Sequence, residues 1–137
     1  MISKIRTSYF GRAKMFDSDK FCLIGIAGKS PDGWTGFEYK KLAPSWSIYK
    51  EWHDAREKSL DPDNDFPVID ENYTRRFIAE RLTPLDVNMV ISDIEKMANG
   101  KIPVLLCYEK PGSFCHRHLV SKWLHSNFPS LDVAESF

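Results

Sequence analysis

The stretch Lys101–His125 reads KIPVLLCYEKPGSFCHRHLVSKWLH, and it decides the fold. Residues 102–108 form a continuous apolar run, which predicts a strand buried on both faces of a sheet. Residues 109–113 have the composition of a turn. Apolar residues at helical spacing follow, up to Leu124. The stretch therefore predicts a central buried strand, a tight polar loop and an amphipathic helix in direct succession.

The rest of the chain continues the α/β order. Lys20–Ala27 is a second apolar run that predicts a buried strand, and Ile5–Phe10 is expected to pair beside it. Further predicted elements are a helix capped by Ser45, a polar connection over Ser59–Pro67, a helix capped by Asp70, a helix from Thr83–Pro84 to Gly100, and a short closing strand over Leu131–Ala134. Right-handed crossovers then predict an α/β fold, a small mostly parallel sheet flanked by helices on both faces, in a single domain over residues 1–137.

Composition limits the classes of function. The formal net charge is zero, with 19 basic and 19 acidic side chains, so bulk charge does not favour nucleic acid. No apolar run has the length of a membrane span, and no membrane partner is expected. The three cysteines follow no secretory h-region, which predicts free thiols and a cytoplasmic location. Cys22 lies in an apolar run and is expected to be a small core residue.

Residues between the predicted strand and helix suit an anion site. Ser113 is the predicted N-cap, with its hydroxyl reaching the amide of His116. Gly112 lets the backbone approach a ligand, and the helix end adds about half a positive charge. Arg117 supplies a forked donor and Lys110 a second charge. An anionic small molecule is the predicted partner. The alternative is that Arg117 pairs with Glu109 or Glu135 and only ties the helix to the sheet.

The same loop suits thiol chemistry. Cys115 is expected in the first turn of the helix, beside a histidine and an arginine, which lowers a thiol pKa. Cys107 lies at a strand end, and Glu109 is a candidate general acid or base. Serine rather than arginine stands six residues after Cys107, which counts against a phosphatase loop. The alternatives are a Cys107 that is merely buried, or a Cys107–Cys115 disulfide that senses redox state, which requires Cα atoms within about 7 Å.

A metal site is the weaker reading of these residues. Cys107, Cys115 and His116, with His118 or His53, are types that zinc accepts. The eight-residue step between the cysteines does not match the short spacing of structural zinc sites. No metal or other cofactor is therefore predicted.

Two further groups are candidates for the site. The hydroxyls of Thr7, Ser8 and Tyr9 lie in a predicted strand, where ordinary strand packing explains them equally well. Trp34, with Lys29, lies in a glycine-rich loop and is a candidate for stacking on a planar ligand or for packing on its own protein. The stripe formed by Trp46, Tyr49 and Trp52 is expected to belong to the core.

Three short segments of the sequence resemble a known family. LLCYEKPGSFCHRHLVSKWL (105–124), TSYF (7–10) and LAPS (42–45) resemble the bacterial and phage family called domain of unknown function 488. The resemblance implies a small single-domain α/β fold and supplies no reaction.

The leading functional hypothesis is a domain that binds a phosphorylated or nucleotide-like small molecule at the turn from Cys107 to Arg117, with group-transfer or hydrolase chemistry. One alternative is nucleic-acid binding through Arg117, Lys110 and a basic helix containing Arg75, Arg76 and Arg81, which zero net charge disfavours. The other alternative is the thiol redox sensor. The sequence assigns no oligomeric state.

Overall fold

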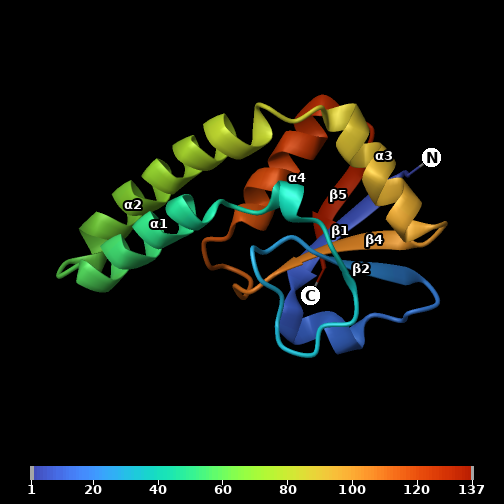
Figure 1. The fold of residues 1–137 in the computed structure, drawn as a ribbon, viewed down its shortest axis with the longest axis horizontal. Coiled ribbons are helices and arrows are strands. Elements are labelled where there is room, and N and C mark those ends of the chain that lie inside the picture. Colours follow the sequence, from blue (N-terminus) through green and yellow to red (C-terminus); the bar gives the residue numbers. More distant parts are fainter. Residues whose placement is uncertain (1, 137) are drawn as a thin grey trace.

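Five parallel strands form the sheet on which the molecule is built (Figure 1). The computed structural model describes residues 2–136. Across the sheet the strands follow the order β3-β2-β4-β1-β5. Their bounds are β1 Lys4–Tyr9, β2 Phe21–Gly25, β3 Phe37–Glu38, β4 Ile102–Cys107 and β5 Asp132–Glu135. The predicted α/β class with a parallel sheet is confirmed, and the short β3 was not predicted.

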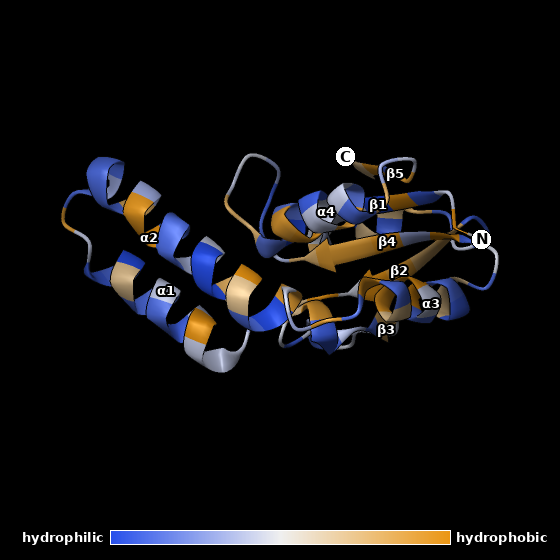
Figure 2. Cartoon of the chain, turned by 90° about the horizontal axis from the view of Figure 1, so that it is seen from above, coloured by the Kyte–Doolittle hydropathy of each residue, from blue (hydrophilic) through white to orange (hydrophobic). Residues whose placement is uncertain are grey.

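β4 is the central strand, as its continuous apolar run predicts. It pairs with β2 on one side and with β1 on the other. Residues 103–107 are all buried, and β4 is hydrophobic along most of its length in Figure 2. Tyr108 lies beyond the strand end and is half exposed. Burial on both faces explains why polar residues begin only where the strand ends.

The neighbours of β1 differ from the prediction. β1 pairs with β4 and β5, and β4 separates it from β2. The chain leaves β1 towards β2 and leaves β4 towards β5, in opposite directions across the sheet. The carboxyl ends of β1 and β4 therefore form a topological switch point, where open α/β sheets usually bind ligands.

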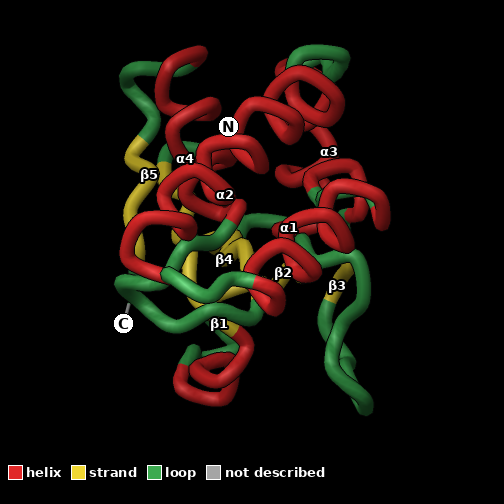
Figure 3. Tube along the Cα trace, turned by 90° about the vertical axis from the view of Figure 1, so that its left-hand side faces the viewer, coloured by secondary structure: helices red, strands yellow, loops and turns green. Residues whose placement is uncertain are grey.

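The long helices cover one face of the sheet. Side chains of α3 (Val87–Ala98) and α4 (His116–Asn127) join one core cluster with Ile5, Ile24 and Leu105, which point to the same face. The 3-10 helix η1 (Phe10–Met15) packs on the other face, where the Phe10 ring lies against Gly25. Figure 3 shows the α-helices together on one side of the strands. The prediction of helices on both faces is therefore corrected to α-helices on one face.

α1 (Trp46–Lys58) and α2 (Pro62–Phe77) form an antiparallel hairpin that extends beyond the sheet (Figure 1). The predicted polar connection over Ser59–Pro67 and helix start at Asp70 are wrong, because α2 begins at Pro62, with Pro67 inside it. Asp70 instead accepts hydrogen bonds across the hairpin from Trp52 Nε1 and Arg56 Nη1, both at 2.8 Å. This pairing offsets the backbone bond that Pro67 removes.

The chain then continues into the sheet layer. α2 runs into a π-helical turn, η3 (Ile78–Leu82). α3 begins at Val87, where Asp86 caps it by accepting from the amide of Asn88, so the predicted start at Thr83–Pro84 is three residues early. The 3-10 turn η2 (Lys40–Leu42) precedes α1, whose predicted Ser45 cap is confirmed. Within residues 2–136, no helix combines the length and hydrophobicity needed to cross a membrane.

Candidate functional site

A cavity of about 650 Å³ opens at the carboxyl ends of β2 and β4. The segment after β2, from Ala27 to Lys29, forms one side of it. Cys107 to Glu109, which end β4 and begin the next loop, form another side. α1 with the segment before it, Tyr73 of α2, Arg81 of η3 and the start of α4 with the loop before it form the rest of the lining. A volume of this size holds a small organic ligand.

Aromatic side chains dominate the wall of the cavity: Trp46, Tyr49, Trp52, Tyr73, Tyr108 and Phe114. The expectation that Trp46, Tyr49 and Trp52 belong to the core is wrong for the first two. Trp46 is 72% exposed and Tyr49 is 41% exposed, with ring centroids 5.8 Å apart. Trp52 packs on Tyr73 and is partly buried. The helical stripe of α1 therefore faces the cavity instead of the sheet.

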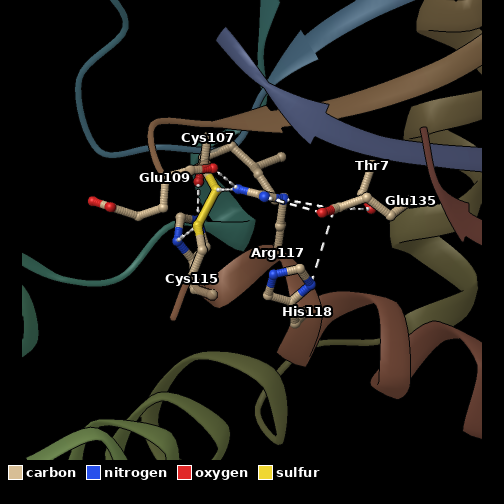
Figure 4. Close-up of a disulfide and its surroundings, with 9 residues drawn as sticks. Thr7, Cys107, Glu109, Cys115, Arg117, His118 and Glu135 are labelled. Atoms are coloured by element: carbon tan, nitrogen blue, oxygen red, sulfur yellow. Dashed lines mark hydrogen bonds and ion pairs between the residues drawn. A yellow bond between two sulfur atoms is a disulfide. The ribbon is translucent and has the colours of Figure 1, made fainter. Parts of the chain in front are cut away.

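Cys107 and Cys115 are joined by a disulfide (Figure 4), and both residues border the cavity. Their Cα atoms are 7.4 Å apart, and both side chains are buried. Cys107 is the last residue of β4, and Cys115 is the N-cap residue of α4. The loop between them brings the two sulfur atoms together. Cys22 is the free cysteine of the described chain and is buried, as predicted. The prediction of free thiols is wrong for Cys107 and Cys115, which are bonded to each other.

His116 is the first residue of α4 and lies beside the disulfide. Its Nε2 is 2.6 Å from the carbonyl oxygen of Ile26, so Nε2 carries the proton and donates it to that oxygen. Nδ1, which then has a free lone pair, lies 3.9 Å from Cys115 Sγ. Burial lowers the pKa of His116 to about 4, against the opposing effect of the Ile26 hydrogen bond. The ring is therefore neutral near pH 7.

Arg117 is fully buried, and its guanidinium is occupied by protein groups (Figure 4). Nε and Nη2 donate to the two carboxylate oxygens of Glu135, at 2.7 and 3.1 Å. Nη1 donates to Cys107 Sγ at 3.1 Å and to the carbonyl oxygen of Glu109. The prediction that Arg117 contacts an external anion does not fit this geometry. The geometry fits the structural alternative, in which Arg117 pairs with Glu135 and ties α4 to the sheet.

Glu135 collects three neighbours at the end of β5. Besides Arg117, the Thr7 hydroxyl donates to Oε1 at 2.9 Å, and His118 Nδ1 lies 3.9 Å away. Burial alone raises the pKa of the Glu135 carboxyl, but hydrogen bonds from Arg117 and Thr7 outweigh it, and the pKa is lowered. Through Arg117, this network also contacts Cys107 Sγ (Figure 4).

The loop before α4 is exposed and departs from the predicted cap. α4 begins at His116, after Cys115, so Ser113 is not its N-cap, and the structure records no side-chain cap at this end. The Ser113 amide instead donates to the carbonyl of Lys110 at 3.2 Å, which closes a turn. Gly112 has φ +84, a conformation that favours glycine. Glu109 borders the cavity, whereas Lys110, Gly112 and Ser113 lie outside its lining.

The three residues Thr7, Ser8 and Tyr9 do not act together. Thr7 is occupied by Glu135. Successive residues of a strand point to opposite faces, so Ser8 faces away from Thr7. Ser8 is buried, with no hydrogen-bond partner for its hydroxyl among the described residues. None of the three lines the cavity.

Trp34 is placed on its own protein. Its ring packs edge-on against Phe10, and its Nε1 donates to the carbonyl of Phe37 at 3.0 Å. Trp34 and Lys29 line a separate hollow of about 400 Å³. Lys29 and Lys40 border this hollow and the main cavity, whereas Trp34 does not border the main cavity. The packing alternative for Trp34 thus agrees with the structure.

A family model described as "DUF488-N3a: Active DUF488-N3 subclade" matches residues 22–128. The chain belongs to this family. The match covers more than half of the chain and includes Cys107, Cys115, His116 and Arg117. No curated protein and no solved structure matches the chain.

Several residues of the cavity in this DUF488 chain carry no local sequence signal. Lys40 and Arg81 border it from segments distant from the strand–loop–helix motif, and Arg81 is anchored by donating to the carbonyls of Ala43 and Lys40. The rings of Tyr73, in α2, and Phe114, in the loop before α4, meet edge-on with centroids 5.1 Å apart, although 41 residues separate them in sequence. The sequence did contain the aromatic stripe of α1, but helical periodicity does not show whether such a stripe faces the core or a cavity, and the stripe was assigned to the core.

Proposed function

We propose that this DUF488 protein binds a phosphorylated, nucleotide-like small molecule in the aromatic cavity. The lining of the cavity is the observation that carries the proposal. Six aromatic side chains surround the space, and three cationic side chains, Lys29, Lys40 and Arg81, accompany one carboxylate, Glu109. Aromatic rings stack on planar bases, and an excess of positive charge favours phosphate.

The position of the cavity supports the same proposal. It lies at the carboxyl ends of two parallel strands, next to the switch point of the sheet. The first residue of α4, His116, borders it, so the positive end of that helix faces the space. An anion is thereby attracted by the helix and by Lys29 and Lys40, in place of the contact with Arg117 expected from the sequence.

Chemistry of the group-transfer or hydrolytic class is part of the proposal. Cys107, Cys115 and Glu109 border the same cavity, so a bound ligand lies against them. The description of the matching family model as an active subclade is consistent with a reaction. Both sulfur atoms are in a disulfide here, so the chemistry requires the reduced protein.

The experiment is a thermal-shift titration of the reduced protein with mononucleotides, nucleosides and inorganic phosphate. Because a ligand bound only by the folded state raises the melting temperature, mononucleotides are expected to raise it more than nucleosides or phosphate alone. Trp46→Ala should weaken mononucleotide binding by about 5- to 150-fold, which corresponds to about 1–3 kcal/mol of base stacking.

Phe37→Ala is the matched control. Phe37 is an exposed aromatic residue, 49% accessible, on β3 and outside the cavity lining. Its removal should leave the affinity unchanged. Equal effects of the two substitutions, or no stabilisation by any mononucleotide, would contradict the proposal.

The disulfide favours a second candidate, the thiol redox sensor. Cys107 and Cys115 are directly bonded, and both border a cavity that admits solutes. A sensor must change state near the cytosolic glutathione potential, about −220 to −320 mV. Equilibration in glutathione buffers, read by mass-tag labelling, should show both forms within that range. A protein that stays in one form throughout is no sensor.

Nucleic-acid binding, the remaining alternative, gains no support from a specific contact. In the basic helix, Arg76 is paired with Glu51 and Glu80, and Arg75 donates to Asn72. Arg81 is anchored on backbone carbonyls beside the cavity. All three arginines of the proposed basic helix are therefore engaged with groups of the protein itself.

A further inference from the structure

We propose that the reduced protein binds one zinc ion through Cys107 Sγ, Cys115 Sγ and His116 Nδ1. These three atoms lie within 4.8 Å of one another, and all three residues are buried. A tetrahedral zinc ion with bonds of about 2.3 Å to sulfur and about 2.0 Å to nitrogen separates its ligand atoms by about 3.5–3.8 Å. The observed 3.9 Å between Cys115 Sγ and His116 Nδ1 is already close to that spacing.

The hydrogen bond of His116 supports its role as a ligand. A zinc-bound histidine usually donates its second ring N–H to a carbonyl or carboxylate, which fixes the ring and directs the free nitrogen to the metal. His116 Nε2 donates to Ile26 in this way, at 2.6 Å, and Nδ1 points to the sulfur atoms. A histidine that served only the core would not need its free lone pair directed at two cysteines.

The sulfur atoms have matching support. Arg117 donates to Cys107 Sγ at 3.1 Å and is held in place by Glu135, an outer contact of the kind that orients metal ligands. The Cα atoms of Cys107 and Cys115 are 7.4 Å apart, wider than the about 4.4–6.8 Å usual for disulfides. This spacing leaves room for a cation between two separate sulfur atoms.

Charge favours zinc at this buried position. Two thiolates and a neutral imidazole around Zn²⁺ form a neutral group, whereas two unpaired buried thiolates are costly. Arg117 and Glu135 form a second neutral group beside it. Cys107, Cys115 and His116 all border the cavity, so the fourth coordination position is open to water or to a ligand. Three protein ligands with an open position are typical of catalytic zinc.

Zinc binding requires the two thiols. A phosphine reductant takes oxygen from water and delivers two electrons and two protons to the disulfide, which becomes two thiols. Zn²⁺ then displaces the two thiol protons into the solvent and forms two zinc–sulfur bonds. The proposal assigns the two sulfur atoms to the metal, and it does not depend on which molecule occupies the cavity.

The experiment measures metal content and coordination in the full chain. Reduced protein is incubated with ZnCl₂ and freed of excess metal by gel filtration. Its zinc content per chain is then measured by elemental mass spectrometry. We expect one zinc per chain in the reduced protein and none in the disulfide form. Co²⁺ in place of Zn²⁺ should give the strong visible absorption of a tetrahedral site and a thiolate charge-transfer band.

Variants identify the ligands. Cys107→Ser, Cys115→Ser and His116→Gln should each weaken zinc binding by more than the about 10–100-fold that loss of an outer contact costs. Cys22→Ser is the matched control, because Cys22 is buried outside the cluster, and it should keep the zinc. Retention of zinc by the cysteine variants would overturn the proposal.

X-ray absorption of the zinc-loaded wild type tests the site without any variant. Two sulfur neighbours at about 2.3 Å and at least one nitrogen at about 2.0 Å are expected. A first shell of oxygen and nitrogen alone, or a substoichiometric metal content after reduction, would overturn the proposal. Nucleotide stabilisation of the metal-free reduced protein is measured separately, so either result stands without the other.

Discussion

The ion pair between Arg117 and Glu135 should be the costliest polar contact to break in this fold. The guanidinium is fully buried, and the Glu135 side chain is 17% exposed. Glu135→Ala removes both charge-assisted hydrogen bonds and leaves a buried cation with only a sulfur and a carbonyl oxygen as partners. Breaking a buried pair from one side typically costs about 3–5 kcal/mol. We expect the free energy of unfolding to fall by about that amount.

Asp132→Ala on the same strand is the matched control. Asp132 also pairs with an arginine, Arg6, at 2.9 Å, but its side chain is 53% exposed. Exposed ion pairs contribute about 0–1 kcal/mol, because water screens them. Urea unfolding of both variants under non-reducing conditions, with equal m-values, gives the comparison. If Glu135→Ala costs no more than Asp132→Ala, the structural role assigned to Arg117 is refuted.

Low pH should also remove the contribution of the Arg117–Glu135 ion pair to the free energy of unfolding. The pKa of Glu135 is lowered from its ordinary value of 4.5, since hydrogen bonds from Arg117 and Thr7 outweigh the burial that raises it. A carboxyl with a depressed folded-state pKa stabilises the fold above its unfolded pKa. The contribution is therefore present above about pH 4.5 and is lost as the pH falls through the folded-state value. The Glu135→Ala variant should lack this acid-sensitive part.

The remaining predictions concern the other side chains of the site. Burial lowers the pKa of His116 from 6.5 to about 4. As the pH falls from 6.5 to 4, the free energy of unfolding should therefore fall by about 3 kcal/mol, because the unfolded state binds the proton first. Urea titrations of wild type and His116→Gln at several pH values check this, and parallel pH profiles would refute it. After reduction, Cys115 should be alkylated faster than Cys22, because burial raises the pKa of the Cys22 thiol. Labelling followed by mass spectrometry measures both rates, and equal or reversed rates would contradict this. Arg117→Lys should lower the melting temperature, because the single nitrogen of lysine cannot occupy the positions of the three guanidinium nitrogens that contact Glu135 and Cys107. An unchanged melting temperature in a thermal-shift assay would contradict this.

Much of the sheet could be predicted because its signals are local. The continuous apolar run of β4 forces burial on both faces, and the direct succession of strand, loop and helix requires a parallel neighbour. Strand order could not be predicted, because the neighbours of β1 are decided by long-range packing. The start of α2 was missed since Pro67 and an acidic run read as a connection, whereas contacts of Asp70 with α1 stabilise the helix.

The strand–loop–helix motif could be read from the sequence, whereas the walls of the cavity could not. Cys107, Glu109 and Cys115 of this motif border the cavity. A sequence window cannot decide whether the Arg117 guanidinium meets a ligand or Glu135, 18 residues away. Trp46 and Tyr49 lie on the face of α1 that lines the cavity. Helical periodicity does not distinguish a face that lines a cavity from one that packs in the core. The free lone pair of His116 depends on Ile26, 90 residues distant in sequence.

The claim that a nucleotide-like molecule occupies the aromatic cavity is tested most directly by the indole N–H signals of the four tryptophans in nitrogen-15 NMR. Trp46 and Trp52 line the cavity, whereas Trp34 and Trp123 do not. On titration with a mononucleotide, the signals of Trp46 and Trp52 should shift and saturate together while those of Trp34 and Trp123 stay in place. Unmoved signals for Trp46 and Trp52, or shifts confined to Trp34 and Trp123, would contradict the proposed function.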